Sequence, residues 1–204
     1  MKIFAIGLNY HSHNKEMKRD FEADAPVVFM KPDTALLRNG NPFFVPDFSD
    51  QIEYETEIVV KINRLGKNIA EKFANRYYDE LTLGIDFTAR DLQLKQKKLG
   101  LPWEIAKSFD GSAPIGEFIN KEKLGAVDNI DFNLKINGDV VQHGNSGDMI
   151  YSIDKIIAYI SQFFTLKIGD LIFTGTPAGV GKVSIDDHLQ GYIGEQKVLD
   201  FKIK

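Results

Sequence analysis

The amino-acid sequence predicts a mainly β fold with a few helices. Three observations support this fold class. Short segments rich in β-branched and aromatic residues recur along the chain, one of them alternates with a period of two, and an Asn-Gly pair joins two others. A chain of 204 residues suits a single hydrophobic core, and it contains no linker, repeat or low-complexity tract. We therefore expect one domain over residues 1–204.

The first third of the chain supplies three predicted strands. Residues 1–8 form a short apolar strand, and the polar residues 11–19 form either a helix or a mobile flap. Prolines bracket the apolar segment 26–32, which is typical of an edge strand. Segment 52–62 alternates most clearly, so its odd and even positions should face opposite sides of a sheet.

The later elements are predicted from turn and capping signals. A strand at about 81–87 leads to Thr88, and the acid Asp91 three residues later predicts a capped helix over 89–99. Residues 132–144 are predicted to form a hairpin with Asn137-Gly138 at its tip. Residues 153–164 have the apolar spacing of a core helix, and residues 171–177 that of a strand.

Composition excludes several classes of protein. The net charge is −4 and the basic residues are scattered, so we expect no nucleic-acid partner. No apolar run approaches the ~20 residues of a membrane span, and the apolar start is too short for a secretory signal, so we expect a cytoplasmic protein without membrane contact. Without cysteine, any bound metal must use oxygen or imidazole ligands, which favours a hard cation.

Three acidic residues are the candidate metal ligands. Glu55 and Glu57 lie two apart on a predicted strand, so both side chains leave the same face and can reach one cation. Mg²⁺ prefers six oxygen ligands and keeps several waters, which leaves room for a third carboxylate. Asp86 lies in an apolar strand just before a predicted helix, where an isolated charge needs a partner. A solvated strand face explains Glu55 and Glu57 about equally well.

The chain resembles the fumarylacetoacetate hydrolase superfamily over nearly its whole length. The resemblance rests on ordered blocks, which are GLNYHSHNKEM, PVVFMKP, YETEIVVKI, DFTARDLQ, KKLGLPWEIAKSFDGSAPIG, GNSGDM and TGTPAGVG. It implies a fold of mixed, rolled β-sheets around a metal site, and it implies a homodimer. It also matches Glu55, Glu57 and Asp86 to the metal carboxylates of the family.

The resemblance implies roles for further residues. Lys107 matches a lysine beside the metal, although a surface lysine remains the alternative. His13 and Glu16 match a catalytic pair on a flap, here residues 10–20, in which Glu16 would orient His13 as a general base. An exposed polar helix is the alternative for that segment.

Four other matched residues are expected to bind substrate, and they are Lys31, Arg90, Gln93 and Thr176. Arg90 could equally be a buried structural ion-pair partner. Asp33 departs from the family, because many relatives carry a small hydroxyl residue there, so we expect a different polarity on that side of the pocket.

The implied function is that of a Mg²⁺-dependent hydrolase, with Mn²⁺ also possible, that cleaves a C–C bond in a small acylpyruvate-type 2-oxo acid. The alternative is an isomerase or decarboxylase acting on 2-hydroxyhepta-2,4-diene-1,7-dioate or oxaloacetate. A non-catalytic β-rich binding module is a third hypothesis, and it predicts no affinity for metal.

Overall fold

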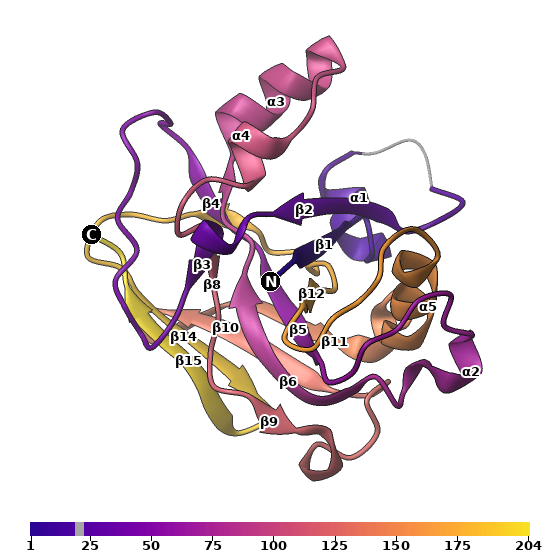
Figure 1. Ribbon diagram of the computed structural model, residues 1–204. Helices are drawn as coiled ribbons and strands as arrows, with labels where there is room; N and C mark the ends of the chain where they lie inside the picture. The colour runs from indigo at the N-terminus through magenta and orange to yellow at the C-terminus, as the bar shows by residue number, and fades with distance from the viewer. Residues whose placement is uncertain (19–22) are drawn as a thin grey trace.

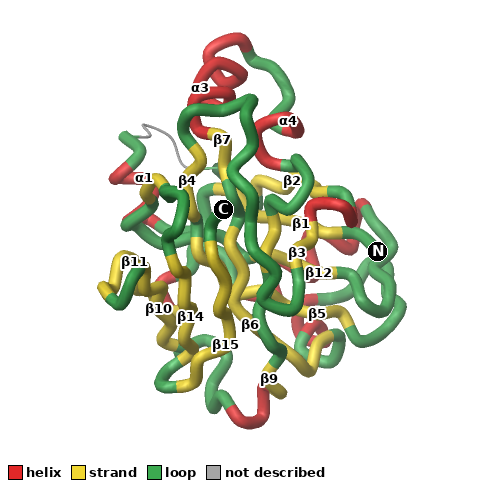
Figure 2. The backbone as a smooth tube through the Cα atoms, turned by 90° about the vertical axis from the view of Figure 1, so that its left-hand side faces the viewer, coloured by secondary structure: helices red, strands yellow, loops and turns green. Residues whose placement is uncertain are grey.

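The computed structural model describes residues 1–18 and 23–204, and it confirms the mainly β fold class. Within these residues, the strands form one six-stranded, one four-stranded and two smaller sheets. Figure 1 shows the sheets at the centre of the molecule and the helices around them. Figures 1 and 2 both show α3 (Arg90–Leu99) and α4 (Glu104–Lys107) together at one end.

The six-stranded sheet has the order β2-β1-β12-β5-β6-β9. Its strands are β2 (Val27–Lys31), β1 (Ile3–Gly7), β12 (Leu171–Phe173), β5 (Thr56–Ile62), β6 (Tyr78–Ile85) and β9 (Ile119–Asn120). Neighbouring strands are antiparallel except for the parallel pair β1 and β12. The proline-bracketed strand β2 lies at an edge of this sheet, as its sequence predicts.

The four-stranded sheet has the order β11-β10-β14-β15. Its strands are β11 (Asp139–Asn145), β10 (Asp131–Ile136), β14 (His188–Ile193) and β15 (Gln196–Lys202). The predicted hairpin of β10 and β11 is confirmed. Asn137 and Gly138 form its tip with φ angles of 54° and 96°, the left-handed conformation that an Asn-Gly turn requires.

The predicted strand 52–62 is divided at Glu55. Residues on its two sides form β4 (Ile52–Tyr54) and β5, which belong to different sheets. The Glu55 carbonyl accepts from the Asp86 backbone N–H at 2.8 Å, and the next backbone N–H, that of Thr56, donates to the Gln142 side chain at 3.0 Å. These contacts with distant residues interrupt a pattern that looks continuous in sequence.

The small sheets and helices complete the fold. One sheet joins β4 to β13 (Gly181–Lys182) and β7 (Thr88–Ala89), and the other pairs β3 (Leu36–Leu37) with β8 (Ala113–Pro114). The remaining α-helices are α1 (His11–Glu16), α2 (Glu71–Ala74) and α5 (Ile153–Phe163), with 3₁₀ turns at η1 (Asp33–Ala35), η2 (Lys121–Lys123) and η3 (Ser146–Asp148). Helix α1 occupies part of the predicted flap 10–20, whose residues 19 and 20 lie outside the described residues.

Helix α3 confirms the predicted helix but not its cap. The helix begins at Arg90, and Gly100 closes it with a φ angle of 65°. Thr88 makes no capping bond, because its hydroxyl donates to the Asp86 carbonyl at 3.3 Å. The Asp91 carboxylate accepts instead from the Ser49 hydroxyl at 2.6 Å and from the Asp50 N–H at 3.1 Å. The capping box predicted from Thr88 and Asp91 is therefore wrong.

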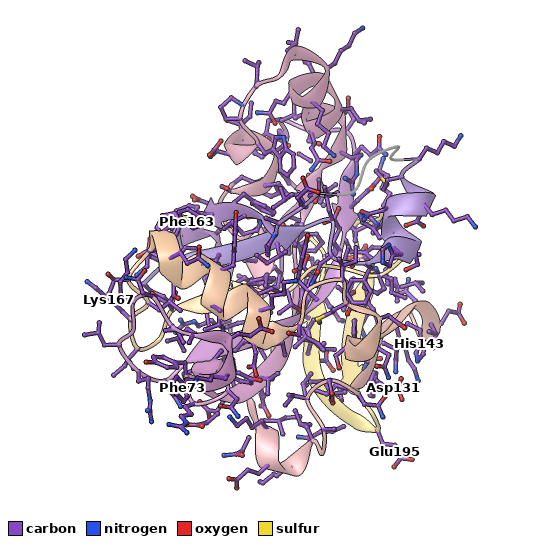
Figure 3. The ribbon with its side chains drawn as sticks, turned by 90° about the vertical axis from the view of Figure 1, so that its right-hand side faces the viewer. Phe73, Asp131, His143, Phe163, Lys167 and Glu195 are labelled. Carbon is purple, nitrogen blue, oxygen red and sulfur yellow. The ribbon has the colours of Figure 1, made fainter. Side chains whose placement is uncertain are left out.

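The core lies between the sheets and helix α5. The apolar face of α5 is buried through Ile153, Ile156, Ile157 and Ile160, which confirms the predicted core helix. Figure 3 shows Phe163 at the outer end of this helix, where its side chain is exposed. The predicted strand 171–177 is shorter than expected, since β12 ends at Phe173 and a loop follows. Among the described helices, none is both long and apolar enough to span a membrane.

Candidate active site and metal centre

Three buried carboxylates meet at the centre of the fold. Glu55, Glu57 and Asp86 each offer one oxygen, and these oxygens lie within 4.8 Å of one another. Glu55 lies in the break between β4 and β5, Glu57 lies on β5, and Asp86 follows β6. The antiparallel pairing of β5 with β6 places Glu57 opposite Gly84 and so brings the acids together across the sheet.

Two of the three acids have buried cationic partners. The Lys107 ammonium donates to Glu55 Oε2 at 2.7 Å and to Asp86 Oδ2 at 2.6 Å. Lys31 Nζ lies 2.8 Å from Asp86 Oδ1. Arg90 Nη2 donates to Glu55 Oε1 at 2.5 Å. Burial alone would raise the pKa of Glu55, but Lys107 and Arg90 hold it well below its ordinary value.

Glu57 differs from the other two acids. It accepts from the Gly175 backbone N–H at 2.7 Å, and no lysine, arginine or histidine of the described residues forms an ion pair with it. Burial and the nearby charges of Asp86 and Glu55 raise its pKa well above the ordinary value. An ionised carboxylate buried in this way needs a further positive charge.

The donor set therefore fits a hard metal ion. All three groups are carboxylates, as Mg²⁺ and Mn²⁺ prefer, and their oxygens are close enough to share one ion. The cluster could hold a metal, and Glu57 is the acid whose charge such an ion would compensate most directly. The solvated strand face considered for Glu55 and Glu57 does not apply, since both side chains are buried.

Lys107 is a buried residue and not the surface lysine that the sequence left possible. It lies at the end of α4, a short helix that the sequence pattern did not predict. Its ammonium also lies 5.5 Å from the centre of the Phe29 ring in the cavity wall. Phe29 in turn packs edge-to-face on Trp103 with ring centres 5.9 Å apart.

His13 and Glu16 form the predicted pair on α1. His13 is buried, and its Nδ1 lies 3.3 Å from Glu16 Oε2. The other oxygen of Glu16 accepts from the Gly179 backbone N–H at 3.0 Å, which attaches α1 to the loop after β12. The alternative of a fully exposed polar helix does not hold, because His13 and Asn14 are both buried.

A small cavity of about 20 Å³ joins these groups. Its wall consists of Ile6, Gly7, Leu8, His13, Phe29, Glu55, Glu57, Asp86, Gln93, Trp103, Lys107 and Thr176. Sequence reasoning did not select the aromatic residues Phe29 and Trp103, although both lie within the matched blocks. Their apolar character gives no signal that separates them from ordinary core residues.

Some predicted substrate-binding residues lie behind this wall. Lys31 is fully buried and donates to the Ser112 hydroxyl at 3.0 Å as well as pairing with Asp86. Arg90 pairs with Glu53 at 2.6 Å and with Glu55, the arrangement expected of a structural ion-pair partner. Gln93 reaches the cavity and also accepts from Arg90 Nη1 at 2.6 Å. Asp33 is exposed and does not line the cavity.

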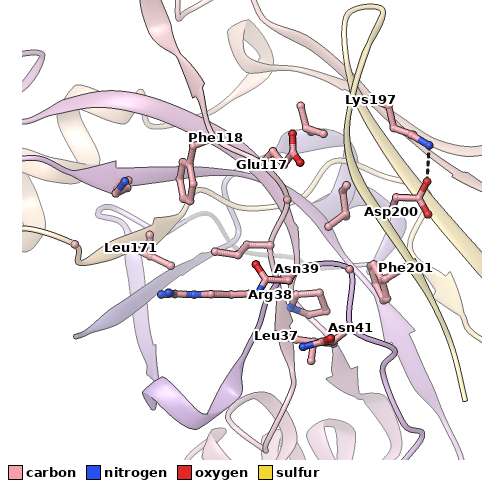
Figure 4. A pocket seen from close by; sticks show the side chains of 18 of the residues that line it. Leu37, Arg38, Asn39, Asn41, Glu117, Phe118, Leu171, Lys197, Asp200 and Phe201 are labelled. Atoms are coloured by element: carbon pink, nitrogen blue, oxygen red, sulfur yellow. Dashed lines mark hydrogen bonds and ion pairs between the residues drawn. The ribbon is translucent and has the colours of Figure 1, made fainter.

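A much larger cavity lies elsewhere. It has a volume of about 980 Å³ and lies between the loop at 37–41, the segment 114–118 and strand β15 (Figure 4). Charged side chains such as Arg38 and Asp200 line it, but none of the three clustered acids does. Size alone would therefore have selected a region without the chemistry of the acidic cluster.

The fold and the acidic cluster together define a mainly β protein with a candidate metal centre. The fumarylacetoacetate (FAA) hydrolase C-terminal family model matches residues 2–203, and the chain belongs to this family. The chain is 40% identical over 202 residues to the mitochondrial oxaloacetate tautomerase FAHD1 of Bos taurus, covering 99% of this chain and 91% of that protein. Since that relative is named as mitochondrial, the cytoplasmic location stays a prediction.

Two solved structures are very similar. A putative fumarylacetoacetate hydrolase family protein from Yersinia pestis superposes with a TM-score of 0.94 at 40% identity, covering 100% of this chain and 93% of that one. Fumarylpyruvate hydrolase from Pseudomonas aeruginosa, solved with Mn²⁺ and pyruvate, has a TM-score of 0.93 at 33% identity, covering 100% and 89%. These relatives are named as enzymes, so the hypothesis of a non-catalytic module is set aside.

Proposed function

We propose that this protein catalyses the keto–enol tautomerisation of a small 2-oxo dicarboxylic acid, oxaloacetate, with Mg²⁺ or Mn²⁺ held by Glu55, Glu57 and Asp86. The observation that carries the proposal is that His13, which contacts Glu16, lines the same small cavity as three converging carboxylates. The similarity to a named oxaloacetate tautomerase over 99% of the chain supports this substrate.

The bound cation would act as a Lewis acid on the 2-oxo group, which makes a hydrogen on the neighbouring carbon more acidic. His13 is the group placed to remove that hydrogen from C3 as a proton, with Glu16 orienting its ring. The electron pair of the C3–H bond becomes the C2–C3 double bond, and the 2-oxo oxygen gains a proton. The reaction therefore moves one proton and consumes no water.

Lys107, Gln93 and Thr176 are the remaining polar residues of the cavity wall. The Lys107 ammonium supplies positive charge where negative charge develops on the substrate oxygen. The Thr176 hydroxyl and the Gln93 amide can hold a carboxylate. The cavity of about 20 Å³ is smaller than a 2-oxo acid, so we expect α1 to move outward when substrate enters.

Hydrolysis of an acylpyruvate is the second candidate. The same His13–Glu16 pair can activate a water, which would attack the distal carbonyl and break the C–C bond to give pyruvate and an acid. The similarity to a fumarylpyruvate hydrolase with bound pyruvate favours this reaction. We place it second because it requires a positioned water in addition to the groups named above.

Purified protein with MnCl₂ or MgCl₂ would be assayed in parallel with enol oxaloacetate and with acetylpyruvate and fumarylpyruvate. Faster loss of the enol absorbance without pyruvate release supports the tautomerase, and pyruvate release from an acylpyruvate supports the hydrolase. The Glu57→Gln variant should lose at least about 100-fold in rate because it removes a metal ligand. Glu80→Gln is the matched control, since Glu80 is a half-exposed partner of Lys61 on the neighbouring strand. Equal rates in both variants would reject the proposed metal centre.

A further inference from the structure

Gln142 is a buried amide outside the candidate site that contacts two parts of it. It lies on β11 and is 2% exposed. The pairing of β10 with β11 shifts register between Leu134 and Lys135, so that Val141 is an extra residue beside Gln142. Such a bulge redirects the neighbouring side chains. Here it accompanies an amide that points toward the Glu55–Glu57 segment and the loop after β12.

All the amide hydrogen-bonding groups of Gln142 have partners. Its Oε1 accepts from the Thr56 backbone N–H at 3.0 Å. Its Nε2 donates to Thr176 Oγ1 at 2.8 Å and to the Pro177 carbonyl at 3.0 Å. Thr56 stands between the two acids Glu55 and Glu57, and Thr176 is in the cavity wall. One side chain thus links the segment 55–57 to the loop after β12, which carries Thr176.

The partners fix the direction of these bonds. The Thr56 N–H can only donate and the Pro177 carbonyl can only accept, so the amide has one orientation. Thr176 Oγ1 must then accept from Gln142, which leaves the hydroxyl hydrogen of Thr176 for another partner. Its contact with the Pro177 carbonyl is 3.5 Å, which is too long for a strong hydrogen bond.

We propose that Gln142 is a positioning residue that makes the Thr176 hydroxyl a hydrogen-bond donor to a carboxylate of the bound oxo acid. The inference rests on the proposed function in so far as that function places an oxo acid beside Thr176. Gln142 does not line the cavity and acts through Thr176. A glutamate at position 142 would keep the size and the acceptor for Thr56 but would accept from the Thr176 hydroxyl, which turns its hydrogen away from the substrate.

Oxalate, a small dicarboxylate, is the probe of binding without turnover. Calorimetry with saturating MnCl₂ should show that Gln142→Glu weakens oxalate binding roughly tenfold or more, as expected when a hydrogen bond to a charged group is lost. The KM for oxaloacetate should rise by a similar factor while kcat changes little. Affinity for MnCl₂ alone should stay close to that of the wild type, because the three acids remain in place. A general structural defect would lower all of these together.

Thr176→Val tests the same step from the other side and should weaken oxalate binding by a similar factor. Because Gln142 acts through Thr176, the double variant should bind oxalate no more weakly than Thr176→Val alone. The matched control is Gln162→Glu, an exposed residue on α5, which should bind oxalate like the wild type.

The proposal is overturned if Gln142→Glu binds oxalate as tightly as the wild type. It is also overturned if the fold losses in oxalate affinity of Gln142→Glu and Thr176→Val multiply in the double variant. If Gln142→Glu does not fold, Thr176→Val decides alone, and unchanged oxalate binding in that variant overturns the proposal. A wild-type protein that binds oxalate but does not tautomerise oxaloacetate rejects the proposed function and leaves this test intact. A wild-type protein that binds no oxalate overturns both.

Discussion

Lys107 is the buried cation that pairs with two acids of the cluster. Its ammonium lies between Glu55 and Asp86, and its side chain is only 4% exposed. Burial alone would lower the pKa of Lys107, but Asp86 and Glu55 raise it above the ordinary value, so the residue is a cation in the folded protein. Two buried carboxylates therefore share this ammonium, while Lys31 and Arg90 each pair with one of them.

Replacing Lys107 by methionine should destabilise the metal-free protein by about 3–5 kcal/mol, since it removes one cationic partner from each of two buried carboxylates. The free energy of unfolding in urea, measured in EDTA, checks this value. Lys61→Met is the matched control, because Lys61 pairs with Glu80 at a similar distance of 2.7 Å but is 40% exposed. The control should lose less than about 1 kcal/mol. Equal losses in the two variants would contradict the expected role of burial.

Asp200 lies on β15 of the four-stranded sheet, with its side chain partly exposed. Burial alone would raise its pKa, but hydrogen bonds from Lys197, His188 and Gln190 lower it to about 2. A lowered pKa means that the folded state favours the carboxylate. This contribution is present above the ordinary pKa of about 4 and is lost as the pH falls toward 2.

Asp200→Asn should therefore be slightly less stable than the wild type at pH 7, by less than about 1 kcal/mol because the carboxylate is partly exposed to solvent. The difference should shrink as the pH falls from about 4 to 2. Urea unfolding of both proteins at several pH values measures it. A difference that grows on acidification would show that the ion pairs have the opposite effect.

Among the elements of the fold, the segment after β8 connects the two large sheets. The Gly116 N–H donates to the Leu83 carbonyl of β6 at 2.9 Å, and the Glu117 N–H donates to the Val198 carbonyl of β15 at 2.7 Å. A Cβ atom at Gly116 would lie 2.2 Å from the Val198 carbonyl oxygen. Backbone cannot move aside as a flexible side chain can, so this close approach requires glycine.

Gly116→Ala should lower the free energy of unfolding by about 1–3 kcal/mol or more, because the new methyl group pushes β15 away from the segment that joins it to the six-stranded sheet. Thermal unfolding gives the loss. Gly7→Ala is the control, since a Cβ there would meet its nearest neighbour, Trp103, at an ordinary 3.7 Å. A Gly116→Ala protein as stable as this control would show that the sheets tolerate separation.

The elements that sequence predicts well are those with local causes. The Asn137-Gly138 turn and the apolar stripe of α5 depend on neighbouring residues alone, and both are confirmed. The break at Glu55 and the missing cap at Thr88 depend on partners far away in sequence, which no local pattern contains. Tertiary contacts decided both.

In the molecule as a whole, the candidate site contains some residues that the sequence alone indicates and others whose positions depend on the folded structure. Spacing on one strand suggests Glu55 and Glu57, and an isolated charge suggests Asp86. The buried position of Lys107 depends on how α4 packs against β2 and β7, so it could not be derived from spacing. The family resemblance indicated Lys107. The sequence did not indicate Gln142, because its contacts with Thr56 and Thr176 exist only after β11 has paired with β10.

Because the three acids come together only in the folded chain, a cation that binds them should stabilise the whole molecule. At a concentration 100-fold above its Kd, MnCl₂ should add about 2.7 kcal/mol to the free energy of unfolding, which corresponds to a rise in Tm of roughly 5–10 °C. EDTA should reverse the rise. Glu57→Gln should fold but show almost no rise, because it lacks the carboxylate with no cationic partner among the described residues. If MnCl₂ raised the Tm of this variant as much as that of the wild type, the ion would bind elsewhere and the acidic cluster would not be the metal centre.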